Sequence, residues 1–320
     1  MAADAKPILP AIPSNKSQDP AHVMDFPTLN LGFAPCSMKE VTMVDLDLTV
    51  FGLEEIAGST KPISVVIVSH GWANKAAQME NFATGMFQEI RRLGAEGKTK
   101  VTRDVIIVTL DQRNHGKRRL KKDQLSYKNN PLRLTAMATT LKGGAQDHQL
   151  IMAYLEDYLF PFGERRVAEY MATGVSLGGH LLWRLLKEDP RVRVAVPIIS
   201  CPPDSLVLVH TAHWRANGTL GTTAQYYPKH VKQFYEEPTP PGTWVGRKIL
   251  ALHGELDQVV PPVFSKDSWP KAVAEAGSDS TEQYIQPGVG HICTPDMVRR
   301  ASYWFYQHGA CAETDLRARL

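Results

Sequence analysis

Short apolar runs alternate with helical patterns along most of the chain. Most of these strand-like segments are rich in valine and isoleucine, and they span residues 41–51, 63–69, 104–110, 167–174, 192–199, 247–252 and 281–286. Between several of these runs, apolar residues recur at helical spacing, first at Met79, Phe82, Met86, Ile90 and Leu93, next at Leu150, Ile151, Tyr154, Leu155 and Tyr158, and then at Leu181, Leu182, Leu185 and Leu186. This alternation predicts a mostly parallel sheet with helices on both faces.

Three stretches depart from the alternation. Residues 1–35 contain six of the prolines and little periodicity, so we expect an irregular Pro-rich arm before a folded domain at 36–320 whose first strand begins near Val41. Residues 112–145 predict a long connection after the strand at 104–110, with several Arg and Lys residues near its beginning. Residues 201–246 mix aromatic side chains with prolines and glycines after a strand, which predicts a lid-like insertion or an oligomer interface. The sequence does not indicate an oligomeric state.

Length and composition exclude several classes of protein. A chain of 320 residues with 43% hydrophobic content is long enough for one large domain, and its net charge of +3 argues against a nucleic-acid or anionic-membrane binder. No run of 18 apolar residues and no secretory signal pattern occur. The four cysteines form no C-x-x-C pair, as expected in a reducing compartment. Neither a metal-ligand spacing nor a Gly-rich phosphate loop is present, so we expect no metal and no cofactor.

Ser176 lies in the motif Gly174-Val175-Ser176-Leu177-Gly178, between a predicted strand and a predicted helix. A serine on such a sharp turn presents its hydroxyl at the tip, and the flanking glycines let the strand and the helix cross closely. The pattern G-x-S-x-G is common by chance, so the predicted strand and helix around it carry the argument.

Three more loops follow predicted strands. The run 63–69 ends in His70-Gly71-Trp72, the run 247–252 leads to Asp257, and the last predicted strand leads to a glycine-rich loop with His291. The order serine, aspartate, histidine is that of α/β-hydrolases. Over about residues 40–310 the chain resembles the α/β-hydrolase superfamily. The resemblance implies a mostly parallel twisted sheet with helices on both faces, a small lid insertion and a Ser-His-Asp triad.

The expected chemistry assigns one role to each of these residues. Ser176 needs a base to become a nucleophile, and His291 follows the last strand, where the family has its base. Asp257 would orient the imidazole, while Asp204, a position that some family members use, and Glu255 stay open as alternative acids.

The developing oxyanion needs two N–H donors. The geometry of the turn indicates the N–H of Leu177, and the resemblance implies the N–H of Trp72. His70, Gly71 and Trp214 are candidates for the substrate pocket, although His70 is also explained as a packing residue. The loop Asp111-Gln-Arg-Asn-His-Gly116 resembles a loop that is mainly structural in this superfamily, with direct catalysis by His115 as the lesser alternative.

Together these features predict a serine hydrolase that cleaves a small or medium carboxylic ester through an acyl-serine intermediate. Such domains also occur in small-molecule biosynthetic pathways. One alternative is a thioester hydrolase, whose basic run from Arg113 to Lys122 would bind the phosphates of an acyl-CoA. A non-catalytic binding protein with the same fold is the other alternative. The ending Ala318-Arg319-Leu320 resembles the peroxisomal Ser-Lys-Leu signal, so we expect a peroxisomal protein recognised by an import receptor, with the cytoplasm as the alternative.

Overall fold

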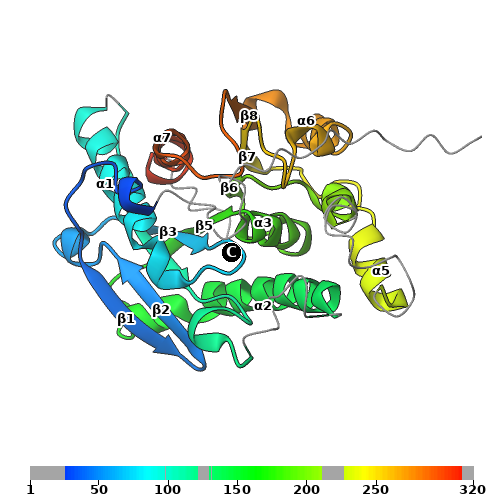
Figure 1. The fold of residues 1–320 in the computed structure, drawn as a ribbon. Coiled ribbons are helices and arrows are strands. Elements are labelled where there is room, and N and C mark those ends of the chain that lie inside the picture. The colour runs from blue at the N-terminus through cyan, green and yellow to red at the C-terminus, as the bar shows by residue number, and fades with distance from the viewer. Residues whose placement is uncertain (1–25, 98, 122–129, 131, 211–226, 312–320) are drawn as a thin grey trace, which may run out of the picture.

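An eight-stranded sheet runs through the centre of the structure (Figure 1). The computed structural model describes residues 26–97, 99–121, 130, 132–210 and 227–311. The strands lie in the order β1-β2-β4-β3-β5-β6-β7-β8, and all neighbours from β4 to β8 are parallel. Their bounds are β1 (Met38–Met43), β2 (Leu46–Phe51), β3 (Ile63–Ser69), β4 (Asp104–Leu110), β5 (Val167–Val175), β6 (Val194–Ile198), β7 (Lys248–Gly254) and β8 (Thr281–Gln286).

Alternate residues of the strands face two different helical layers. On β3, Val66 and Val68 belong to the core that includes helices α1 (Glu80–Glu96) and α7 (Pro295–Phe305). The intervening Val65 and Ile67 belong to the core of α2 (Arg133–Leu159) and α3 (Leu177–Glu188), which lie on the other side of the sheet (Figure 1). Because both faces are covered, the central strands are apolar at nearly every position, as the sequence pattern indicated. Two short helices, α5 (Lys229–Glu236) and α6 (Trp269–Ala276), complete the helical elements of eight or more residues in the described chain.

The run 41–51 is a hairpin and not the single strand that its apolar pattern predicted. Val44 has φ of 59° at the turn, and β1 and β2 pair in an antiparallel register from Met38 opposite Phe51 to Met43 opposite Leu46. The turn carries Asp45, a residue that favours tight turns, between two apolar runs. The fold therefore begins at Met38, slightly before the expected Val41.

The predicted long connection 112–145 is also corrected, because α2 begins at Arg133. Gly143 and Gly144 would weaken an isolated helix. In the fold, a Cβ at Gly144 would lie 2.1 Å from Leu181 Cδ1, so the missing side chain lets α2 approach α3. Close packing between the two helices outweighs the low helix propensity of the glycine pair.

The described part of the N-terminal arm packs on the domain. Phe26–Thr28 form a 3-10 turn, and Leu29 is completely buried against α1, where a Cβ at Gly85 would lie 2.1 Å from the Leu29 carbonyl oxygen. Of the predicted lid, the structure describes residues 201–210 and 227–246, which include α5. Residues 1–25, Trp214 and Ala318-Arg319-Leu320 lie outside the described residues.

Candidate active site

Four loops at the carboxyl edge of the sheet bring the predicted site residues together. Ser176 follows β5 directly, Trp72 follows β3, Asp257 follows β7 and His291 follows β8. Strand ends on this edge are the usual location of sites in open α/β sheets.

Ser176 lies in a strained turn between β5 and α3. Its φ of 55° and ψ of −111° are unusual for a residue with a side chain. A Cβ at Gly174 would lie 2.3 Å from the Gly178 carbonyl carbon, and one at Gly178 would lie 2.2 Å from the Ser69 carbonyl oxygen. Gly174 is therefore required where β5 and α3 cross, and Gly178 is required where α3 meets the end of β3, both at backbone contact distance.

Strain of this kind recurs along the same edge. Ala73, Asn114, Ser176 and Ile199 all have positive φ, between 43° and 65°, and they follow β3, β4, β5 and β6 respectively. Each such residue costs about 1–3 kcal/mol and persists only because the surrounding structure fixes it. The fold thus concentrates backbone strain beside the candidate site.

Ser176, His291 and Asp257 form a continuous hydrogen-bonded chain. Ser176 Oγ lies 2.9 Å from His291 Nε2, and His291 Nδ1 lies 2.7 Å from Asp257 Oδ2. Since an ionised carboxylate only accepts hydrogen bonds, the neutral imidazole has its proton on Nδ1, and Nε2 accepts from the serine hydroxyl. The exposed fractions are 8% for Ser176, 3% for Asp257 and 1% for His291, so the chain of groups is shielded from water.

Asp257 is held ionised although it is buried. Burial opposes its charge, but the charge and hydrogen bond of His291 and the backbone N–H groups of Val259 and Val260 together lower its pKa. Those two N–H groups donate to Asp257 Oδ1 at 2.9 and 2.8 Å, which leaves Oδ2 for the imidazole. The carboxylate is thereby oriented from both sides.

The two alternative acids have other contacts. Asp204 Oδ1 accepts from the N–H and the hydroxyl of Thr239, and Asp204 Oδ2 lies 3.8 Å from Lys271 Nζ. Glu255 Oε2 accepts from the N–H of Gly288 at 2.8 Å, in the loop that leads to His291. The geometry thus places Asp257, and neither alternative, against the imidazole. The support that Glu255 provides to the histidine loop was not predicted from the sequence.

The two proposed oxyanion donors share one apolar cluster. Leu177 is the first residue of α3, where backbone N–H groups have no partner within the helix. The Trp72 and Leu177 side chains are 6% and 2% exposed and belong to a cluster with residues of α2, α3 and α5: Leu134, Met137, Ala138, Leu141, Leu181, Val231 and Tyr235. This cluster forms an apolar wall at the site.

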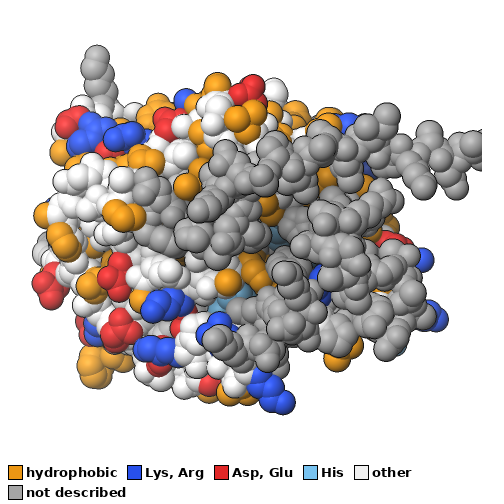
Figure 2. All heavy atoms as spheres, viewed as in Figure 1, with side chains coloured by type: hydrophobic (Ala, Val, Ile, Leu, Met, Phe, Trp, Pro, Cys, Tyr) orange, Lys and Arg blue, Asp and Glu red, His pale blue; other side chains and the backbone are white. Residues whose placement is uncertain are grey.

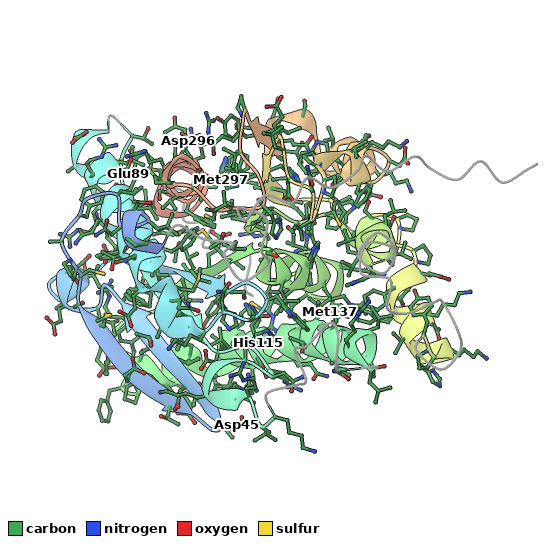
Figure 3. The ribbon with its side chains drawn as sticks, in the orientation of Figure 1. Asp45, Glu89, His115, Met137, Asp296 and Met297 are labelled. Carbon is green, nitrogen blue, oxygen red and sulfur yellow. The ribbon has the colours of Figure 1, made fainter. Side chains whose placement is uncertain are left out.

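His70 is fully buried and contacts backbone groups. Its Nε2 lies 3.0 Å from the N–H of Gln112, and its Nδ1 lies 2.9 Å from the Gly71 oxygen. The His115 ring lies 5.2 Å from the His70 ring and 5.4 Å from the Trp72 ring, measured between centroids. Figure 3 shows His115 near α2, on which Met137 is labelled. These contacts favour structural roles for His70 and His115, and sequence reasoning had not singled out Gln112.

Two arginines of the basic run form ion pairs with a carboxylate on α2. Arg113 Nη2 and Arg118 Nη1 lie 2.9 and 2.6 Å from the buried carboxylate of Asp147 on α2. Arg118 also donates to the Asp111 carbonyl oxygen at 3.1 Å. These two guanidinium groups anchor the loop after β4 to α2.

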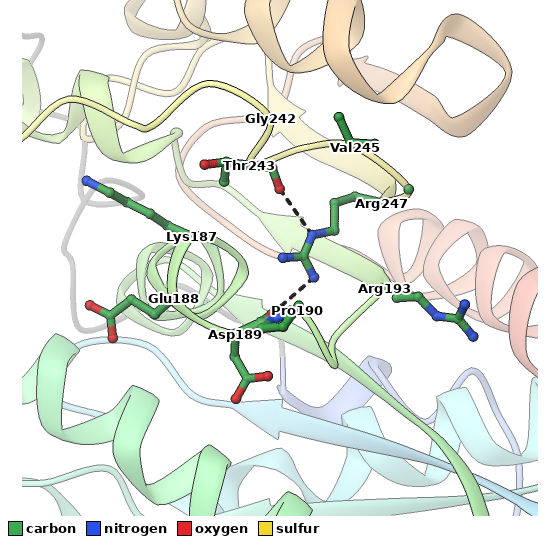
Figure 4. Close-up of a pocket in the computed structure, with 10 residues that line it drawn as sticks. Lys187, Glu188, Asp189, Pro190, Arg193, Gly242, Thr243, Val245 and Arg247 are labelled. Carbon is green, nitrogen blue, oxygen red and sulfur yellow. Dashed lines mark hydrogen bonds between the residues drawn. The ribbon is translucent and has the colours of Figure 1, made fainter. Parts of the chain in front are cut away.

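A surface pocket of about 280 Å³ lies at the opposite edge of the sheet, where β6 and β7 begin (Figure 4). Its most buried cation is Arg247, whose guanidinium donates to the carbonyl oxygens of Thr243, Asp189, Leu186 and Val192. Those bonds cap the end of α3 and fix the next turn, which is a structural role.

The described chain shows neither a membrane span nor a metal centre. None of its helices is both long and apolar enough to cross a bilayer. Among these residues, histidine, cysteine, aspartate and glutamate side chains form no group of three or more that could hold a metal ion. On the face in Figure 2, Lys and Arg are interspersed with Asp and Glu over the described surface.

Comparison with known proteins identifies the fold. No family model matches the chain, and no curated protein sequence does. Among solved structures, TT1662 from Thermus thermophilus is 15% identical with a TM-score of 0.60, over 86% of this chain and 98% of that one. Est1E from Butyrivibrio proteoclasticus, solved with ferulic acid, is 14% identical with a TM-score of 0.54, over 86% and 100%.

An acylaminoacyl peptidase from Pyrococcus horikoshii is 13% identical with a TM-score of 0.55, over 87% of this chain and 42% of that one. The sheet order and these likenesses agree. The chain has the α/β-hydrolase fold, as its sequence resemblance implied.

Proposed function

We propose that this protein is a serine hydrolase that cleaves a carboxylic ester through an acyl-Ser176 intermediate. The proposal rests on the 2.9 Å contact between Ser176 Oγ and His291 Nε2, backed by the 2.7 Å contact between His291 Nδ1 and Asp257. Esterase and peptidase names among the structural neighbours agree with acyl transfer. Fold likeness at this identity leaves the substrate open.

In the first half-reaction, Ser176 Oγ attacks the ester carbonyl carbon while its proton passes to His291 Nε2. Asp257 stabilises the imidazolium that forms. The N–H groups of Leu177 and Trp72 would donate to the oxyanion, each contributing about 3 kcal/mol. When the carbon–oxygen bond to the alcohol breaks, the leaving alcohol takes the proton from His291.

In the second half-reaction, water attacks the acyl-enzyme. His291 removes a proton from this water, and a second tetrahedral intermediate forms in the same place. Collapse expels Ser176 Oγ, which regains the proton from His291, and the carboxylic acid leaves. The apolar wall beside Trp72 and Leu177 favours an uncharged, hydrophobic portion of the substrate.

Labelling with a fluorophosphonate tests the proposal. We expect the wild type to be labelled and Ser176→Ala to be unlabelled, with kcat reduced by at least about 10⁴-fold on p-nitrophenyl esters, while circular dichroism shows both proteins folded. A folded wild type that is never labelled would instead support the non-catalytic binding protein.

A substrate panel separates ester from thioester hydrolysis. p-Nitrophenyl esters and acyl-CoAs of matched chain length are compared by kcat/KM. Because Arg113 and Arg118 are engaged by Asp147, we expect the esters to be preferred. A higher kcat/KM for acyl-CoAs would establish the thioesterase alternative.

The proposed location is the peroxisome, through Ala318-Arg319-Leu320. Fluorescent fusions with and without this tripeptide test it. We expect punctate fluorescence only with the tripeptide, and diffuse fluorescence of both fusions would indicate the cytoplasm.

A further inference from the structure

The end of β3 and the loop after β4 are joined through His70 and Gln112. The N–H of Gln112 donates to His70 Nε2 at 3.0 Å, and the side-chain amide of Gln112 donates to the His70 carbonyl oxygen. Both residues are buried, with exposed fractions of 0% for His70 and 1% for Gln112. We refer to this pair as the His70–Gln112 clamp.

The clamp fixes which ring nitrogen of His70 has the proton. A backbone N–H can only donate, so Nε2 accepts from Gln112 and the neutral ring has its proton on Nδ1. That proton then points to the Gly71 carbonyl oxygen, 2.9 Å from Nδ1. The N–H of Asn74 donates to the same oxygen at 3.2 Å. Two donors therefore hold the Gly71 carbonyl in one orientation.

Holding the Gly71 carbonyl also orients the N–H of Trp72. The two groups belong to one planar trans peptide unit, in which the C=O and the N–H point in opposite directions. The Trp72 N–H consequently points away from the His70 Nδ1–H and the Asn74 N–H. Ala73, the next residue, has φ of 62°, so the chain turns sharply straight after this peptide.

The same backbone segment lies against the turn that carries Ser176. Ser69 pairs with Gly174 in the sheet. A Cβ at Gly178 would lie 2.2 Å from the Ser69 oxygen and 2.8 Å from the His70 oxygen. The His70 carbonyl that Gln112 holds is thus in direct contact with the first turn of α3. The clamp and the serine turn share one interface.

We propose that Gln112 and His70 are positioning residues that orient the Trp72 N–H as the second oxyanion donor beside Ser176. The proposal rests on the proposed function and deepens it, because it assigns a role to the loop after β4. Neither residue touches the substrate: the His70 ring acts on the Gly71–Trp72 peptide, and the Gln112 side chain acts on the preceding His70–Gly71 peptide.

The surroundings of His70 favour the neutral form of its imidazole ring. Burial lowers the pKa of His70, against the opposing influence of the Gly71 carbonyl and of Asp111, whose Oδ1 lies 4.0 Å from Nε2. The neighbouring His115 has its own pKa lowered to about 4, first by burial and then by His70. Protonation of Nε2 would put two donors face to face at the Gln112 N–H.

Substitution Gln112→Met tests the side-chain half of the clamp, because methionine has a similar shape but donates no hydrogen bond. Gln88→Met on α1 is the matched control: its amide also donates to a backbone carbonyl, that of Ala34, at 3.4 Å. We expect Gln112→Met to lower kcat about 10- to 100-fold with KM changed less than about threefold, and Gln88→Met to match the wild type.

An inhibitor that forms a tetrahedral adduct distinguishes a role in oxyanion binding from a general structural role. A trifluoromethyl ketone adds to Ser176 and forms an oxyanion, so its inhibition constant should rise by the same factor by which kcat/KM falls. His70→Gln, whose amide lies near the Nε2 position and which lacks the Nδ1 donor to the Gly71 carbonyl, should behave similarly. The double variant should lose no more than the worse single variant, because both changes act on the same short backbone segment from His70 to Trp72.

The outcomes separate the two proposals. A folded Gln112→Met with wild-type kcat and inhibitor affinity would overturn the clamp proposal alone. The same conclusion would follow if the variant changed KM as much as kcat, or if Gln88→Met lost as much kcat as Gln112→Met. If Gln112→Met does not fold, His70→Gln decides by the same measurements. A wild type that no fluorophosphonate labels would overturn the proposed function itself and the clamp with it.

Discussion

His291 and His70 are two buried histidines at the same edge of the sheet, and their ring partners differ. His291 lies between a hydroxyl, that of Ser176, and a carboxylate, that of Asp257. His70 lies between a backbone N–H and a backbone carbonyl. The first pair of partners can give up a proton and stabilise the resulting imidazolium, whereas the second pair opposes protonation.

The comparison shows that location at a strand end does not make a histidine a base. Both residues follow predicted strands in glycine-containing loops, so local sequence does not distinguish their roles. The hydrogen-bond partners of the ring determine whether a histidine can act as a general base. A general base must receive its proton from the nucleophile and have its cation stabilised. The following predictions test this distinction.

The largest effect should come from the partner of His291. Asp257→Asn should lower kcat by about 10⁴-fold, because an amide favours the wrong imidazole tautomer. Asp204→Asn is the matched control, since Asp204 contacts Thr239 and Lys271, and its kcat should stay within about threefold of the wild type. Steady-state kinetics on a p-nitrophenyl ester measures both. Equal losses in the two variants would contradict the assignment of Asp257.

An intermediate effect should come from the group around His70. The pKa of His115 is about 4 in the fold, mainly because of burial, against about 6.5 in the unfolded chain. Below pH 6.5 the unfolded state therefore binds more protons, so stability falls as pH decreases from 6.5 towards 4.

From pH 7 to 5, His115 alone should reduce the free energy of unfolding by about 2 kcal/mol. Asp257 adds no slope there, because its lowered pKa places its loss of stability at more acidic pH. Urea unfolding of the wild type and His115→Gln at both pH values measures this difference. An unchanged pH dependence in the variant would show that His115 is not the source.

The smallest effect should come from the support of the His291 loop. Glu255→Ala removes the acceptor for the Gly288 N–H, but the backbone bonds from Glu255 to Gln286 and from Leu256 to Val289 remain. We expect a loss of about 1 kcal/mol in unfolding free energy and at most a few-fold loss in kcat. A loss in kcat comparable to that of Asp257→Asn would support Glu255 as the acid of the triad.

The strand runs of the sequence located the central sheet well, because strands buried on both faces are apolar without interruption. The runs at 63–69 and 104–110 coincide with β3 and β4, and the more polar segment 281–286 coincides with the edge strand β8. The hairpin at 38–51 and the start of α2 were missed. In both places the deciding factor was local conformation or packing, a positive φ at Val44 and the approach of α2 to Leu181.

By itself the sequence determined the order of the elements, the turn that carries Ser176 and the set of candidate acids and bases. Each of these depends on neighbours along the chain. Only the tertiary structure decided that Asp257, and neither Asp204 nor Glu255, meets His291, and that Gln112 holds His70. Those choices depend on contacts between residues 34 and 42 positions apart. Parallel strands bring such residues together only when the whole sheet has formed.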